Sequence, residues 1–461
     1  MTLTKLAIAT SGGLATLALV GCVSPSAENA TPSPHAAVVT TSMTNKAVET
    51  EQQLCFDTHD AIQCPESGLY SGQDAQHTGH SQSYTAHNDG TVTDHISGLM
   101  WTPSPDTNGD NTINKADKLS SSDAIAYCET LEYAGYTDWQ LPNIKQGYSL
   151  INFQGRDPDP RARDISDLTP FVDTDVFGFA YGNKRDRERV IDSQYASTSA
   201  YTNDEGTKML FGVNLADGRI KGYEEDFFGS PKTYFVQCVR GNTDYGTPEY
   251  VDNGDKTITD TQSGLMWAQN DSGSDYSRGI DYKNAFNWSQ SEGLDGSPIK
   301  EDFNKHGAMN WVEALGYVQQ MNQENYLGYN DWRLPNVKEL ITITDYRFSP
   351  AATGSPAIDP MFNLTTITNE NGNEDWAFYW SSTTHAAMLN GELKGDFASY
   401  VAFGRSMGYS KTLGKWIDVH GAGSQRSDPK VWDGSDFSAG RGPQADVIRI
   451  YNYVRLVRDA L

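Results

Sequence analysis

Residues 91–101 read TVTDHISGLMW, and residues 257–267 read TITDTQSGLMW. Three further pairs of segments match in the same order: GYTDWQLPN at 135–143 with GYNDWRLPN at 328–336, GRIKGY at 218–223 with GRSMGY at 404–409, and YFVQCVR at 234–240 with NYVRLVR at 452–458. Four matched blocks in one order indicate a duplicated domain. The stretch between the copies, residues 241–247, is rich in Gly, Asn and Asp, as is typical of a linker.

The pattern within each copy predicts an α+β domain. A strand at the TVT or TIT segment leads into Gly-Leu-Met-Trp, and we expect the closing strand of each copy to lie beside that first strand. Apolar residues recur at helical spacing in residues 310–322, which match residues 122–133 of copy one. Shorter elements are expected as a helix at 337–343 and as aromatic strands at 194–200 and 378–382.

The N-terminus has the features of a bacterial lipoprotein signal. Lys5 precedes an apolar segment, residues 6–20, that is too short to span a bilayer, and LVGC at 19–22 matches a lipobox. We expect removal of residues 1–21 and acylation of Cys22 with diacylglycerol and palmitate. Position 23 is not Asp, the inner-membrane retention signal, so an outer-membrane lipoprotein is expected. Residues 22–53 should form a disordered tether, because residues 23–53 lack aromatic residues.

Four cysteines remain after acylation, and in an exported protein they are expected to form disulfides. Four thiols allow three pairings. Cys128 and Cys238 align with Val318 and Leu456 of copy two, and a buried bridge replaced by two apolar residues explains that exchange. The repeat therefore favours Cys128–Cys238, which leaves Cys55–Cys64.

Residues 106–117 read DTNGDNTINKAD, with the ligand spacing of an EF-hand or dockerin calcium loop. The expected ligands of one structural Ca²⁺ in the first domain are Asp106, Asn108, Asp110, the Thr112 carbonyl, Asn114 and Asp117. Asn replaces the usual Gly at position 6, and Asp replaces Glu at position 12. The alternative interpretation is therefore a polar surface turn.

Aromatic and basic residues give weaker indications of a ligand surface. The tryptophans of the matched blocks are expected in the core: Trp101, Trp139, Trp267 and Trp332. The candidates for an exposed binding surface lie in the variable part of copy two: Trp376, Tyr379, Trp380, Trp416 and Trp432. Basic residues interleaved with acids are expected to form a self-neutralised loop: Lys184, Arg185, Arg187 and Arg189. Solvated loop histidines, without a metal, are expected at His77, His80, His87 and His95.

The combination of matched blocks resembles the bacterial Lcl C-terminal domain family, typified by a collagen-like adhesin and formerly a domain of unknown function. The resemblance rests on TVTD…SGLMW, DWxLPN and the VxCVR end of copy one, and it covers about residues 54–461. It implies two tandem C-type-lectin-like domains, residues 54–242 and 246–461, and a binding module similar to a glycosaminoglycan-binding adhesin. Copy two departs from the family pattern, because it lacks the Cys pair and carries an insertion at 268–309.

Composition and motifs favour a binding protein over an enzyme. The 461 residues include 60 acidic and 35 basic residues, a net charge of −25 that argues against a nucleic-acid binder. The sequence contains no Gly-x-Ser-x-Gly, His-Glu-x-x-His, P-loop or Cys–His motif. We expect a non-enzymatic envelope or cell-surface lipoprotein that recognises glycan or matrix polysaccharide and contacts the membrane through its lipid. The alternatives are an envelope enzyme that uses unidentified carboxylates on glycans and a structural envelope protein.

Overall fold

The computed structural model describes residues 45–460 apart from 163, 228, 277–278 and 286–305. The signal peptide, Cys22 and the expected tether up to residue 44 lie outside the described residues, as does part of the insertion at 268–309. About 29% of the chain is strand and 13% is helix, a mixed fold that is rich in strands. Within the described ranges, no helix is both long and apolar enough to cross a membrane.

Each copy begins and ends in a four-stranded antiparallel sheet. In copy one the order is β13-β5-β4-β3, from β13 (Val239–Gly241), β5 (Leu99–Trp101), β4 (Val92–Asp94) and β3 (Tyr84–Ala86). In copy two it is β26-β16-β15-β14, from β26 (Val457–Asp459), β16 (Leu265–Ala268), β15 (Thr257–Asp260) and β14 (Tyr250–Asp252). The expectation that the first and last strands adjoin was wrong, because the Leu-Met-Trp strand lies between them and buries its Trp on the core side.

The Asp-Trp-x-Leu-Pro-Asn block positions a short helix in each copy, α2 (Ile144–Ser149) and α6 (Val337–Ile343). Asn143 and Asn336 are their N-caps, and each side chain accepts a hydrogen bond from the third helical N–H. The Trp indole N–H donates to a backbone carbonyl in both copies, that of Tyr133 at 3.2 Å and that of Tyr326 at 2.8 Å. The longer helices are α1 (Ser121–Thr130) and α5 (Trp311–Gln323), close to the predicted ranges.

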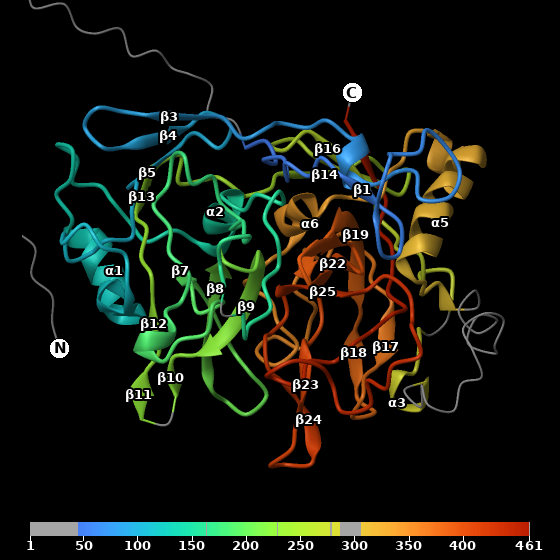
Figure 1. Ribbon diagram of the computed structural model, residues 1–461. Helices are drawn as coiled ribbons and strands as arrows, with labels where there is room; N and C mark the ends of the chain where they lie inside the picture. Colours follow the sequence, from blue (N-terminus) through green and yellow to red (C-terminus); the bar gives the residue numbers. More distant parts are fainter. Residues whose placement is uncertain (1–44, 163, 228, 277–278, 286–305, 461) are drawn as a thin grey trace, which may run out of the picture. The chain divides into compact units, whose positions relative to one another are not determined.

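The two copies share one six-stranded antiparallel sheet (Figure 1). Copy one contributes β7 (Gln194–Thr202), β8 (Lys208–Asn214) and β9 (Arg219–Glu224), and copy two contributes β19 (Phe378–Thr384), β22 (Phe397–Ala402) and β25 (Gln425–Pro429). Their order is β19-β22-β25-β9-β8-β7, so β25 and β9 join the copies. The strand that takes the place of β9 in copy two is thus β25. The matched block at 404–409 leads instead into a separate hairpin of β23 (Met407–Ser410) and β24 (Lys415–Asp418).

The segment from residue 45 to residue 80, here called the leader, packs largely against copy two although it precedes copy one. Gln52 exchanges hydrogen bonds of 2.6 and 2.9 Å with the backbone of Thr384, and Asp74 accepts a 2.5 Å hydrogen bond from Thr383. Val48 and Thr50 are fully buried. The tether predicted for residues 22–53 is therefore too long, because residues 48–52 belong to the folded part.

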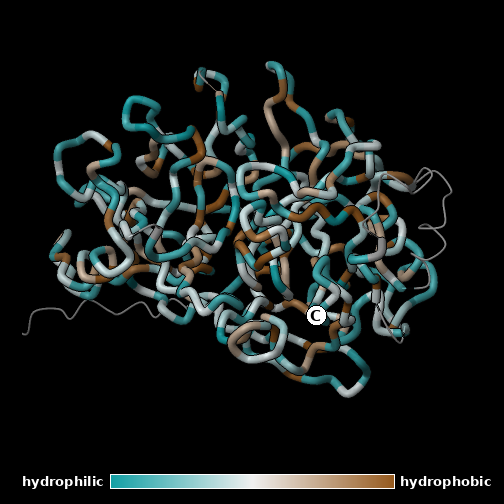
Figure 2. The backbone as a smooth tube through the Cα atoms, turned by 90° about the horizontal axis from the view of Figure 1, so that it is seen from below, coloured by the Kyte–Doolittle hydropathy of each residue, from teal (hydrophilic) through white to brown (hydrophobic). Residues whose placement is uncertain are grey.

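Reciprocal lysine contacts hold the two copies together at α2 and α6. Lys145 Nζ donates to the carbonyls of Gly246 and Thr342, both at 2.8 Å. Lys338, its equivalent in copy two, donates to the carbonyls of Glu49 and Ser149, both at 2.9 Å. Because Thr342 and Ser149 hold equivalent helix positions, the same contact is made twice in opposite directions. Figure 2 shows hydrophobic segments inside both halves and mostly hydrophilic outer loops.

Both disulfides join the expected cysteines. Cys55–Cys64 closes a loop within the leader, and Cys128–Cys238 ties α1 to the start of the closing strand, with a Cα–Cα distance of 5.5 Å. The other elements of the described residues are short. There are four 3-10 helices: η1 (Asp74–Gln76), η2 (Lys115–Asp117), η3 (Lys184–Asp186) and η4 (Tyr326–Gly328). One short α-helix and five pairs of strands complete them: α3 (Tyr282–Ala285), β1 (Cys55–Phe56) with β2 (Ala61–Ile62), β6 (Leu119–Ser120) with β12 (Thr233–Tyr234), β10 (Asp226–Phe227) with β11 (Ser230–Pro231), β17 (Thr366–Thr368) with β18 (Glu374–Trp376), and β20 (Ala387–Leu389) with β21 (Glu392–Lys394).

Candidate functional site

A cleft of about 340 Å³ lies where the two copies meet in the shared sheet. This seam cleft is lined by β9, β22 and β25, and by two loops at 157–160 and 441–446. Alternate residues of a strand point to the same side, so Arg219, Lys221 and Tyr223 of β9 all reach the cleft. Neither copy alone forms it.

Charged side chains of both signs line the seam cleft. The basic residues are Arg189, Arg219, Lys221, Arg426 and Arg441. The acidic residues are Asp157, Asp159, Asp217, Asp428 and Asp446. In a chain with a net charge of −25, five basic side chains around one cleft mark a local departure from the overall charge.

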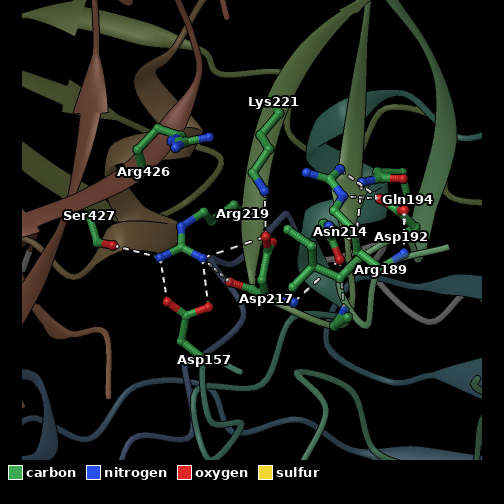
Figure 3. Close-up of polar contacts among 12 residues, drawn as sticks. Asp157, Arg189, Asp192, Gln194, Asn214, Asp217, Arg219, Lys221, Arg426 and Ser427 are labelled. Atoms are coloured by element: carbon green, nitrogen blue, oxygen red, sulfur yellow. Dashed lines mark hydrogen bonds and ion pairs between the residues drawn. The ribbon is translucent and has the colours of Figure 1, made fainter. Parts of the chain in front are cut away.

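The copy-one side of the cleft is an ordered ion-pair network (Figure 3). Arg219 donates to both carboxylate oxygens of Asp157, at 2.8 and 2.7 Å, in a bidentate pair. Its second terminal nitrogen also donates to Ser427 Oγ of β25 at 3.0 Å, which links the two copies. Lys221 donates to Asp217 Oδ2, and the other oxygen of Asp217 is buried without a partner among the described residues.

The copy-two side repeats this arrangement with a histidine. Arg426 donates to Asp446, whose Oδ1 lies 2.9 Å from Nε2 of His420. Burial opposes ionisation of Asp446, but Arg426 and His420 outweigh it and hold its pKa well below the usual range. Burial, followed by the charge of Arg426, lowers the pKa of His420. At neutral pH, His420 is therefore uncharged and Asp446 is an ionised acceptor.

Two groups in the cleft titrate near neutrality. Burial lowers the pKa of Lys221 to about 8, although Asp217 opposes the shift. Burial raises the pKa of Asp428 to about 8, against a backbone hydrogen bond from Arg449. At pH 7, Lys221 is therefore mostly charged and Asp428 is mostly protonated and neutral.

The seam cleft suits a hydroxyl-rich ligand that also has an apolar face. Guanidinium groups supply donors and carboxylates supply acceptors, which together match the hydroxyls of a sugar. The half-buried Phe397 ring adds an apolar surface at the wall, and the Arg441 guanidinium lies 4.4 Å from its centroid. Arg189 and Arg441 are exposed at the rim, where they face solvent and incoming ligand.

The aromatic residues expected to form an exposed surface do not do so. Tyr379 and Trp380 are completely buried in β19, so the prediction was wrong for both. The reason is that both faces of this strand are covered, and alternation cannot place either side chain in solvent. Trp416 is 8% exposed, and Trp376 and Trp432 are half-buried. None of the five lines the seam cleft.

The loop at 106–117 is closed by its own hydrogen bonds. Asp106 accepts from the N–H groups of Gly109 and Asn111, and Asp117 accepts from those of Asn108 and Asn114. Asn111 has a φ of 63°, the left-handed conformation usually taken by Gly at position 6. In the described part of the chain, no group of three or more His, Cys, Asp and Glu side chains could hold a metal ion. The fit to calcium thus depends on the amide and carbonyl oxygens as well as the carboxylates.

The other sequence-predicted residues separate into core, loop and site. Trp101, Trp139, Trp267 and Trp332 are at most 2% exposed, which confirms their core role. In the basic loop, Lys184 bonds to backbone carbonyls, and Arg189 pairs with Asp192 while also lining the seam cleft. His87 and His95 are exposed, as expected. His77 instead is half-buried and lines a second cavity.

Sequence reasoning missed the central residues of the seam cleft. The available signal was Arg219 and Lys221, two basic residues at alternate positions inside a matched block. When a strand has apolar or small residues on one face and charged residues at alternate positions on the other, the charged face indicates a functional site or an interface. No comparable sequence pattern pointed to Arg426 and Asp446 as cleft residues, because the segments that contain them lie outside the matched blocks.

Comparison with known families gives one result. A family model described as the Lcl C-terminal domain matches residues 90–240 and again residues 256–415. The two matches cover most of both copies and omit the leader and the C-terminal 46 residues. No curated protein and no solved structure matches the chain.

Proposed function

Because the chain belongs to the Lcl C-terminal domain family, an adhesin-type family and not an enzyme family, we propose that it is a surface-binding lipoprotein that recognises glycan or matrix polysaccharide at the seam cleft. The observation that carries this proposal is the joint lining of the cleft by both copies. A likeness of each copy to C-type-lectin folds is part of the same proposal. Duplication then creates a site that a single copy lacks.

An acidic polysaccharide is the ligand that best fits the charge arrangement. Three of the five carboxylates that line the cleft are engaged by its own basic side chains, Asp157 by Arg219, Asp217 by Lys221 and Asp446 by Arg426. At the rim, Arg189 is exposed but paired with Asp192, and Arg441 is exposed and forms no ion pair among the described residues. A glycan array that includes neutral and acidic polysaccharides tests the proposal. Failure of the intact protein to bind any of them would contradict it.

Arg441→Ala is expected to weaken binding of an acidic polysaccharide about tenfold, equivalent to about 1.4 kcal/mol. The side chain is exposed and forms no ion pair among the described residues, so its loss should spare the fold. Surface plasmon resonance against the array-selected glycan measures the effect. Arg347→Ala is the matched control, since Arg347 is 78% exposed and lies outside the cleft. Equal losses in both variants would locate the binding elsewhere.

Anchoring through a lipid on Cys22 is proposed from the lipobox at residues 19–22. The acyl chains would place the protein at the outer membrane. Cys22→Ser is expected to leave the protein unacylated. Mass spectrometry of the mature N-terminus, with membrane fractionation, checks this, and an acylated N-terminus at another residue would contradict it.

Calcium at the 106–117 loop is proposed as a structural ion. Each carboxylate oxygen that accepts an N–H retains a further lone pair for a cation. The affinity expected for an extracellular module is about 10⁻⁴ to 10⁻³ M, so calcium at ten times the dissociation constant would add about 1.4 kcal/mol of stability. Differential scanning calorimetry of the intact protein should show a rise in Tm with calcium and none with the Asp106→Ala, Asp110→Ala double variant. An equal rise in both proteins would place the ion at another site.

A further inference from the structure

A second cavity, of about 510 Å³, lies between the leader and copy two, away from the seam cleft. Its walls are leader residues between 46 and 80, residues 263–265 at the start of β16, Arg333 with the N-terminal end of α6, residue 382 of β19, and residues 459–460 at the end of β26. We call it the leader cavity. Its volume is within the usual range for small-molecule sites.

Four carboxylates line the leader cavity: Glu49, Asp74, Glu339 and Asp459. Asp459 accepts from Arg333 at 3.0 Å. Glu339 is neutralised by a bidentate pair with Arg333, at 2.5 and 2.7 Å. Glu49 accepts from neutral donors, namely Thr50 N–H at 3.0 Å, the Thr50 hydroxyl at 3.4 Å and Asn336 Nδ2 at 3.3 Å. Asp74 Oδ2 accepts from the hydroxyls of Thr50 and Thr383. Among the described residues, neither Glu49 nor Asp74 forms an ion pair.

Buried polar atoms in this cavity lack hydrogen-bond partners among the described residues. They are Asp74 Oδ1, Ser382 Oγ and His77 Nε2. Asp74 and Ser382 are each 1% exposed, so water outside the cavity does not reach them. A buried polar group without a partner costs about 1–3 kcal/mol. Other unpartnered polar atoms are scattered through the described chain, but these three belong to residues that line one cavity, which suits a polar ligand.

Two cationic side chains also line the leader cavity, but Arg333 is paired with Glu339 and Asp459, and Lys46 donates to the Ser263 carbonyl at 3.2 Å. Glu49 and Asp74 therefore remain without a paired cation among the described residues, which favours a cationic ligand. Burial raises the pKa of Asp74 to about 7, and the charge of Glu49 adds to the shift. Burial also raises the pKa of Glu49. Burial lowers the pKa of His77, which is therefore neutral at pH 7 and supplies no positive charge. A bound cation would stabilise both carboxylates in their ionised forms.

The equivalent end of copy one lacks this acidic character. There Gln146 takes the position of Glu339, Gln140 that of Arg333, and Thr198 that of Ser382. Gln146 forms the same capping contact as Glu339, since its side chain accepts from Asn143 N–H at 2.9 Å. The helix cap therefore does not require a carboxylate. The acidic cavity is a feature of copy two and the leader alone.

We propose that the leader cavity binds a small ligand through a primary ammonium group. Such a group has three N–H donors, and Asp74 Oδ1, Ser382 Oγ and His77 Nε2 are three free acceptors for them when the histidine carries its proton on Nδ1. A bare metal ion fits less well, because its ligands must close around it within about 2.6 Å. Among the described residues, no group of three or more His, Cys, Asp and Glu side chains is placed to hold a metal ion. This inference is independent of polysaccharide binding at the seam cleft.

Isothermal titration calorimetry of the full chain with three probes tests the inference. Glucosamine and cadaverine carry a primary ammonium, on a sugar ring and on an alkyl chain respectively, and N-acetylglucosamine is the neutral control. We expect at least one amine to bind at least tenfold more tightly than N-acetylglucosamine at about 0.15 M salt, where distant surface charges are largely screened. Binding of glucosamine alone assigns an amino sugar, and binding of cadaverine assigns an alkyl ammonium ligand. Absence of binding by both amines overturns the proposal.

Variants locate the ammonium site. Asp74→Asn is expected to weaken amine binding at least tenfold, because it removes the charge and one acceptor. Asp396→Asn is the matched control, since this carboxylate pairs with His59 outside the leader cavity. Ser382→Ala provides a second test if Asp74→Asn does not fold, with an expected loss of about fivefold. Unchanged amine affinity in a folded Asp74→Asn or Ser382→Ala protein overturns the proposal.

Discussion

A fragment containing only residues 246–461 is expected not to fold as a monomer, although it includes a whole copy of the repeat. It would lose the β9 partner of β25, which leaves an exposed central edge on its three-stranded half sheet. It would also lose the leader, whose residues Val48, Thr50 and Gln52 are buried. Lys338 would lose both carbonyl partners, and a buried ammonium without partners is strongly destabilising.

Near-ultraviolet circular dichroism and thermal unfolding measure this effect. The isolated fragment is expected to show no cooperative transition, whereas the protein from residue 43 onward should unfold cooperatively. Co-expression of residues 43–245 with residues 246–461 is the matched control, because it restores every lost contact without the covalent link. A monomeric 246–461 fragment with the Tm of the intact protein would show that the shared sheet contributes little.

Replacement of Cys128 and Cys238 by Ala is expected to lower the free energy of unfolding by about 4.8 kcal/mol. The bridge spans 110 residues, and the chain-entropy model assigns this value to a loop of that size. For Cys55–Cys64, which spans 9 residues, the same model gives about 2.6 kcal/mol. Chemical denaturation of the intact protein and the two double variants measures both losses.

Copy two supplies a matched control for this experiment. Its equivalents of the cysteines, Val318 and Leu456, are both buried core residues. The Cys128→Val, Cys238→Leu variant should therefore recover part of the loss through apolar burial but not the loop constraint. A loss of unfolding free energy below about 1 kcal/mol in the Ala variant would be ordinary for a single substitution. It would show that the bridge does not stabilise the fold by restricting the conformations of the unfolded chain.

Local elements could be read from the sequence because local chemistry determines them. The helix at 337–343 agrees with the structure because its apolar spacing and its Asn cap lie in one continuous segment. The Cys128–Cys238 disulfide could be predicted because the duplication provides an internal comparison, with Val318 and Leu456 at the equivalent positions of copy two. The tryptophans of the matched blocks were placed in the core for the same reason.

Long-range pairing could not be read in this way. Nothing in the composition of β9 or β25 specifies that they adjoin, since strand partners are selected by the packing of the whole chain. The leader carries no repeat signal, and its contacts with Thr383 and Thr384 join residues more than 300 positions apart. The aromatic run at 378–380 was misjudged for a related reason. Exposure depends on what covers β19, which the sequence of the strand does not reveal.

The reciprocal contacts of Lys145 and Lys338 make the junction between the copies isologous, the type of interface found in twofold-symmetric homodimers. The chain thus has the organisation of a fused dimer, with its self-complementary surface already used internally. The outer strands of the shared sheet are also covered, since Tyr195 of β7 bridges to Phe235 and Tyr379 of β19 bridges to Tyr453. An isologous interface closes after two units, so the shared sheet has no free position for a third copy of this domain.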